Sequence, residues 1–127
     1  MPPAVAAGAL ASIKLVRSEY GKKLRGRHQL SAAKLKAMLM DAGIPVMPSE
    51  THIVPVLIGD PRLCKQASDT LMDAYGIYVQ PINYPTVPRG TERLRFTPTP
   101  LHSNADMLHL VKSLREVWES LELKKAA

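Results

Sequence analysis

A proline-rich stretch, Gly76 to Pro100, constrains most strongly what this chain can fold into. Two short apolar runs, Ile77–Val79 and Leu94–Phe96, lie at its two ends. The loop between them contains four residues that interrupt regular structure: Pro81, Pro85, Pro88 and Gly90. Because proline lacks an N–H group and fixes φ, we expect this loop to lie outside helices and outside the interior of a sheet.

Charged and apolar residues alternate directly after this loop, in Arg93-Leu94-Arg95-Phe96. A strand spanning Leu94–Thr97 with a side-chain period of two would place both arginines on one face and the apolar pair on the other. A guanidinium on a strand beside a cleft can bind a carboxylate through two hydrogen bonds. The alternative is two solvated arginines on the outer face of a sheet.

The residues before the loop predict a long N-terminal helix, or two helices in series, from Pro2 to about Ala42. Apolar residues recur at three- and four-residue steps, which is typical of an amphipathic helix. Gly21 and Gly26 predict a bend or break between them. Gly43 and the proline two residues later predict the end of the helix.

Three strands and two further helices are expected after this helix. The apolar run His52–Ile58 predicts a strand, in which Pro55 favours a sheet edge. Asp60 and Pro61 predict the start of a helix that ends at Gly76, and a second strand follows at Ile77–Gln80. Ser103, with Asp106 three residues later, predicts the capped start of the last helix. The fold class is α+β, with a small mixed three-stranded sheet and helices on one face.

The composition narrows the possible functions. The chain has 127 residues and a net charge of +6. A single cysteine, Cys64, excludes a disulfide framework, and the four scattered histidines predict no metal site even though His102 and His109 could meet. The basic run Lys22–Arg27 leaves open a domain that binds anions or nucleic acid. We expect instead a solvated helix face, with neither a nucleic acid nor a membrane as partner.

Several segments together resemble a known family. They are His52–Val56, Gly59–Pro61, Leu63–Lys65, Tyr75–Gly90 and Leu94–Arg95. They resemble the 5-aminolevulinate synthases, a branch of the α-oxoamine synthases, which have the fold-type I architecture of pyridoxal 5′-phosphate (PLP) enzymes. The resemblance covers essentially the whole chain. It implies a connecting helical segment over residues 1–45 and a small C-terminal α+β domain over residues 46–127.

The resemblance also implies site residues. Arg95 matches the arginine that holds the glycine carboxylate, and Thr86 matches a threonine that contacts the succinyl-CoA carboxylate. Arg93 matches no such anchor, and we expect it to have a supporting or surface role. Lys14, Lys22, Lys34 and Lys65 match no cofactor-lysine motif. We therefore expect no catalytic residue, no cofactor-binding residue and no metal ligand in this chain.

The resemblance implies a C-terminal fragment of a PLP-dependent acyltransferase that condenses glycine with succinyl-CoA at the entry to tetrapyrrole and heme synthesis. The Schiff-base lysine and the main cofactor contacts would lie upstream, so we expect the isolated chain to be inactive. The family implies a homodimer located in the bacterial cytoplasm or the mitochondrial matrix. The alternative is a non-catalytic fragment, or a binding or oligomerisation module, derived from such an enzyme.

Overall fold

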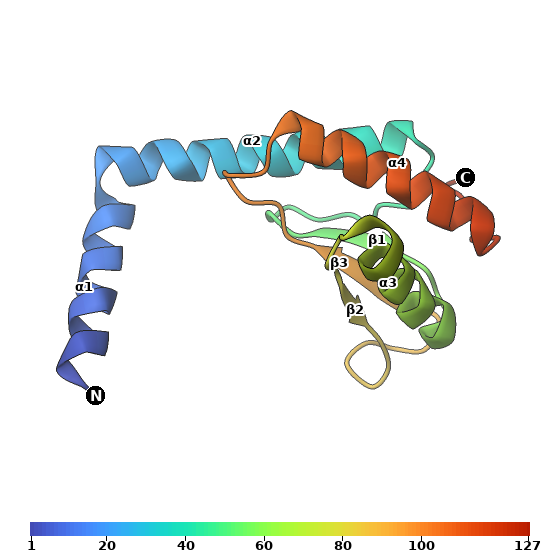
Figure 1. The fold of residues 1–127 in the computed structure, drawn as a ribbon, viewed down its shortest axis with the longest axis horizontal. Coiled ribbons are helices and arrows are strands. Elements are labelled where there is room, and N and C mark those ends of the chain that lie inside the picture. The colour runs from blue at the N-terminus through green and yellow to red at the C-terminus, as the bar shows by residue number, and fades with distance from the viewer.

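A computed structural model describes all residues from Met1 to Ala127 and has four helices and three strands (Figure 1). In chain order the elements are α1 (Pro3–Arg17), α2 (Glu19–Asp41), β1 (Val54–Leu57), α3 (Pro61–Tyr75), β2 (Gln80–Ile82), β3 (Arg93–Phe96) and α4 (Asn104–Ser120). The α+β class expected from the sequence is confirmed.

The three strands form one sheet in the order β1-β3-β2. Both neighbouring pairs are antiparallel, so the prediction of a mixed sheet is wrong. The last strand, β3, lies between β1 and β2, which run in the same direction without pairing to each other. This order places Pro55 on the edge strand β1, as the sequence predicts.

The second strand begins later than its apolar run. It spans Gln80–Ile82, whereas Ile77–Val79 carries no ladder pairing. Pro81 therefore lies in a strand, opposite Leu94, one residue beyond the predicted end of this strand at Gln80, but at the edge of the sheet and not in its interior. The edge position of β2 explains this placement, because an edge residue can lack an N–H without breaking an inner ladder.

The core lies between one face of the sheet and the helices α2, α3 and α4. It includes Leu39 of α2, Leu71 of α3, Val56 and Leu94 of the sheet, and Trp118 of α4. Burial of these apolar side chains is the main force that holds the layers together. Because Leu39 and its neighbour Leu35 belong to this cluster, the C-terminal half of α2 is anchored to the sheet.

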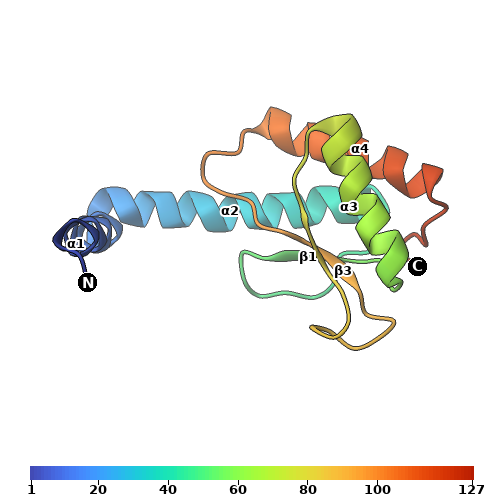
Figure 2. The ribbon, with the colours of Figure 1, turned by 60° about the horizontal axis from the view of Figure 1, so that its bottom comes forward.

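The two N-terminal helices meet at a corner. The break lies at Ser18, not between Gly21 and Gly26, because the Ser18 side chain accepts a hydrogen bond from Gly21 N and so caps α2. A Cβ atom at Gly21 would lie 2.3 Å from the main-chain oxygen of Leu15, so this corner requires glycine. Figures 1 and 2 show α1 projecting from the far end of α2, away from the sheet.

Helix α1 buries no residue in this chain. Several of its apolar side chains are at least half exposed: Val5, Leu10, Ile13, Leu15 and Val16. None of the helices is both long enough and apolar enough to cross a lipid bilayer.

The N-terminus of α4 carries the expected cap. The carboxylate of Asp106 accepts hydrogen bonds from the hydroxyl and the main-chain N–H of Ser103, both at 2.7 Å, and the Ser103 hydroxyl accepts one from Asp106 N. The hydrogen bonds from the side chain and then the backbone of Ser103 lower the pKa of Asp106 below its usual value.

We expect Asp106→Asn to destabilise the chain at pH 7 but not in strong acid. A carboxyl with a lowered folded pKa contributes stability above its unfolded pKa of about 3.9, and this contribution is lost as pH falls through the folded value. Urea midpoints of both proteins, measured at several pH values, would check this. Asp73→Asn, at an exposed carboxylate, is the control, and a midpoint difference that persists unchanged in strong acid would contradict the cap's role.

Candidate functional site

Strand β3, which carries Arg93 and Arg95, has the predicted alternation of buried and exposed side chains. Leu94 and Phe96 are buried in the core, Arg93 is half-buried, and Arg95 is exposed on the opposite face. Because β3 is the central strand, it is hydrogen-bonded on both sides and holds the Cα of Arg95 in a fixed place. The base of a carboxylate-binding side chain is therefore rigid.

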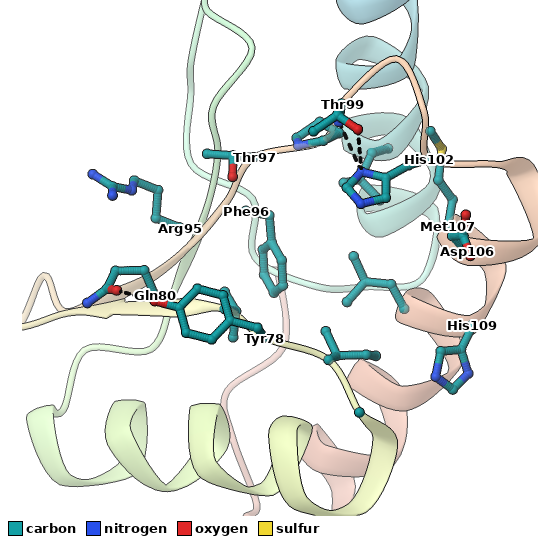
Figure 3. A pocket seen from close by; sticks show the side chains of 16 residues that line it. Tyr78, Gln80, Arg95, Phe96, Thr97, Thr99, His102, Asp106, Met107 and His109 are labelled. Atoms are coloured by element: carbon teal, nitrogen blue, oxygen red, sulfur yellow. Dashed lines mark hydrogen bonds between the residues drawn. The ribbon is translucent and has the colours of Figure 1, made fainter. Parts of the chain in front are cut away.

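The Arg95 side chain borders a cavity of about 620 Å³. Its guanidinium makes no hydrogen bond or ion pair within the chain, whose only salt bridge joins Lys65 to Asp69. In Figure 3, Arg95 points away from Phe96, Met107 and His109. The guanidinium is thus free to meet a ligand at the outer rim of the cavity.

Polar neighbours accompany Arg95 on this face. Gln80 is its cross-strand partner, and the hydroxyl of Tyr78 donates to Gln80 Oε1 at 2.8 Å (Figure 3). Thr97 lies two residues after Arg95 and also lines the cavity. These three residues are not among the site residues expected from the sequence, although a period of two, extended from Arg95 to Thr97 and applied to the preceding strand, points to them.

Two histidines lie along the other side of the same cavity. His102 Nδ1 accepts a hydrogen bond from Thr99 N at 2.9 Å (Figure 3). His109 Nε2 lies 3.0 Å from the main-chain oxygen of Tyr75. These contacts orient the rings toward the backbone. No group of three or more histidine, cysteine or acidic side chains is arranged to hold a metal ion.

Thr86 lies on the exposed loop and does not line the Arg95 cavity. The loop is held by local contacts: Thr86 N donates to Asn83 O at 3.0 Å, and the Arg89 guanidinium lies 4.5 Å from the centre of the Tyr84 ring. The structure therefore holds the two predicted substrate contacts on rigid segments but does not bring them together in one cavity.

No lysine lines the cavity, so no side chain there could form a Schiff base with PLP. Lys65 is paired with Asp69, and Lys36 Nζ donates to the main-chain oxygens of Ser49 and Thr51. No amine in this chain is therefore placed beside Arg95 to bind an aldehyde cofactor.

Two other sequence features have structural roles. Cys64 is fully buried, and burial raises the pKa of its thiol to about 11, so the thiol stays protonated and unreactive at neutral pH. In the basic run Lys22–Arg27 the charged side chains are exposed on α2, and Arg27 donates to the main-chain oxygen of Pro100.

The helices packed on one face of a small antiparallel sheet are shared with a known class of enzymes. The family model for aminotransferase class I and II matches residues 1–114, and the chain belongs to this family. It is 52% identical to the 5-aminolevulinate synthase of Paracoccus denitrificans over 99% of this chain and 31% of that protein. It is 54% identical to the mitochondrial 5-aminolevulinate synthase of Kluyveromyces lactis over 98% of this chain and 22% of that protein.

Solved structures agree with this assignment. Serine palmitoyltransferase from S. paucimobilis, with a bound PLP–myriocin aldimine, superimposes with a TM-score of 0.83 at 26% identity, covering 96% of this chain and 30% of that one. The enzyme from Sphingomonas wittichii also gives 0.83, at 25% identity and the same coverage. The resemblance expected from the sequence is confirmed, and the chain spans about 30% of the length of the bacterial synthases it matches.

Proposed function

We propose that this chain is the C-terminal part of a PLP-dependent acyltransferase that condenses glycine with succinyl-CoA to 5-aminolevulinate, CoA and carbon dioxide. The supporting observation is an identity of 50% or more to several bacterial 5-aminolevulinate synthases along nearly all of this chain. Residues 1–45 would connect to a large domain and residues 46–127 would form the small domain. The exposed apolar side chains of α1 are in keeping with packing against such a domain.

Arg95 is assigned to the glycine carboxylate. A planar guanidinium can donate two parallel hydrogen bonds to a carboxylate, which fixes both the position and the rotation of a small amino acid. When bound, PLP supplies an electron sink for the bond that breaks at Cα. The contribution of Arg95 would be orientation: by fixing the rotation of the amino acid, it would select which bond at Cα breaks.

Thr86 is assigned to the carboxylate of the succinyl group. Its side chain is exposed and can donate a hydrogen bond from a loop with little conformational freedom. Because Thr86 lies outside the Arg95 cavity, we assign Thr86 and Arg95 to opposite ends of the combined substrates. The working enzyme is proposed to be a homodimer, located as its bacterial or mitochondrial relatives are.

A chimera tests the proposal. The upstream part of the Paracoccus denitrificans synthase is joined to this chain at the matching position, and the product is assayed with glycine, succinyl-CoA and PLP. We expect 5-aminolevulinate and CoA to form in equal amounts, and we expect the isolated chain to form neither. A chimera that folds and binds PLP but makes no 5-aminolevulinate, beside an active parent enzyme, would overturn the proposal.

A further inference from the structure

One acidic side chain is wholly enclosed within this chain. Glu92 is 0% exposed, its Oε2 accepts a hydrogen bond from Gly90 N at 2.9 Å, and its Oε1 has no hydrogen-bond partner. A buried carboxylate with an unpaired oxygen is destabilising, because the oxygen loses its hydrogen bonds to water and gains none in the protein. The sequence gives no sign of this burial, because a glutamate between a threonine and an arginine resembles a surface residue.

Glu92 joins the end of the proline-rich loop to the connection between β1 and α3. Its main-chain oxygen accepts hydrogen bonds from both Ile58 N and Gly59 N at 2.9 Å. Gly59 also packs closely on Gly90, since a Cβ atom at Gly59 would lie 3.3 Å from the Gly90 oxygen. The side chain and the main chain of Glu92 therefore hold the same turn in place.

The start of the loop is attached to the same region. Asn83 Nδ2 donates to the main-chain oxygen of Pro61 at 3.1 Å, and Asn83 Oδ1 is the other buried side-chain oxygen without a partner. Both ends of the segment 83–92 are thus fixed to residues 58–61, through the side chain of Asn83 at one end and the main-chain oxygen of Glu92 at the other, while the Glu92 side chain holds Gly90 within the segment. Between these two attachments lies Thr86.

Glu92 lies next to the start of α3, because its main-chain oxygen is bonded to Ile58 N and Gly59 N, which directly precede Asp60, the residue that caps this helix. The partial positive charge at a helix N-terminus stabilises a nearby anion. A neutral amide of the same shape would lose this attraction and would bury an N–H donor in place of the unpaired oxygen.

We propose that Glu92 is a positioning residue that fixes the segment 83–92, and with it the Thr86 hydroxyl, and so sets the preference for an acyl-CoA whose acyl chain ends in a carboxylate. This inference rests on the proposed function. A hydrogen-bond donor displaced by about 1 Å loses most of its advantage for a charged acyl group, while an uncharged acyl group is affected little.

The test compares two acyl-CoA substrates of equal chain length in the chimera. Butyryl-CoA carries a methyl group where succinyl-CoA carries a carboxylate. For Glu92→Gln we expect the ratio of kcat/KM for succinyl-CoA to that for butyryl-CoA to fall about tenfold, with the glycine KM within about twofold of the starting protein. In a Thr86→Val background, Glu92→Gln should not lower this ratio further. Both substitutions remove the same interaction, the hydrogen bond from Thr86 to the acyl carboxylate.

Glu119→Gln, at an exposed carboxylate, is the matched control and should leave the ratio unchanged. Asn83→Ala releases the other end of the segment and should also lower the ratio, which covers the case in which Glu92→Gln does not fold. Equal losses for both acyl-CoAs in these variants, or an unchanged ratio, would overturn the positioning role. A starting chimera that folds but makes no 5-aminolevulinate would instead overturn the proposed function, and the inference with it.

Discussion

Arg95→Lys in the chimera should raise the glycine KM about 10- to 100-fold, since lysine keeps the charge but cannot form the paired hydrogen bonds. The Arg95 guanidinium has no ion-pair or hydrogen-bond partner within the chain. Its replacement therefore removes only the contact with the ligand. The KM for succinyl-CoA should change much less, because Arg95 is assigned to the other substrate. Steady-state kinetics with each substrate varied in turn would measure both effects.

Arg93→Lys is the matched control for this experiment. Arg93 lies on the same strand and the same face, but it is half-buried, and its Nε donates to the main-chain oxygen of Thr91 at 2.9 Å. We expect its glycine KM to stay within about twofold of the starting protein. An unchanged glycine KM in Arg95→Lys, or equal increases in both variants, would remove the case for Arg95 as the carboxylate anchor.

Trp118→Ala should lower the free energy of unfolding by about 3–5 kcal/mol, the usual range for truncating a large buried aromatic residue. Trp118 is 1% exposed in the core, and its Nε1 donates to the main-chain oxygen of Lys124 at 3.0 Å. The substitution therefore creates a cavity and also releases the C-terminal segment. Because small domains are stable by only about 5–15 kcal/mol, this loss removes a large share of the free energy of unfolding.

Denaturant unfolding followed by far-ultraviolet circular dichroism would measure this loss without relying on the removed tryptophan. Leu101→Ala is the control: Leu101 is 86% exposed, and its truncation should change the free energy of unfolding by less than about 0.5 kcal/mol. A Trp118→Ala protein as stable as this control would show that α4 does not pack on the sheet as described.

Features that depend on neighbouring residues could be predicted from the sequence. Asp60 caps α3, Ser103 caps α4, and Gly76 ends α3 with φ of +66°, each at the position that its side chain or its lack of one requires. The two faces of β3 follow equally from a period of two. Arg95 could be singled out in this way, although its assigned ligand came from the resemblance.

Contacts between residues far apart in the sequence decided the other features of the fold and of the site. Pro81 could enter a strand only because β3 inserts beside it and leaves β2 at an edge, and no local pattern specifies that order. The burial of Glu92 depends on the connection between β1 and α3 folding over the end of the loop. The cavity that Arg95 shares with His102 likewise joins separate segments. The sequence by itself determined where α3 and α4 start, where α3 ends and which face of β3 is charged, because these depend on hydrogen bonds and side-chain direction within a few residues. Only the tertiary structure decided strand order, polar burial and the grouping of site residues, because these depend on which remote surfaces exclude water together.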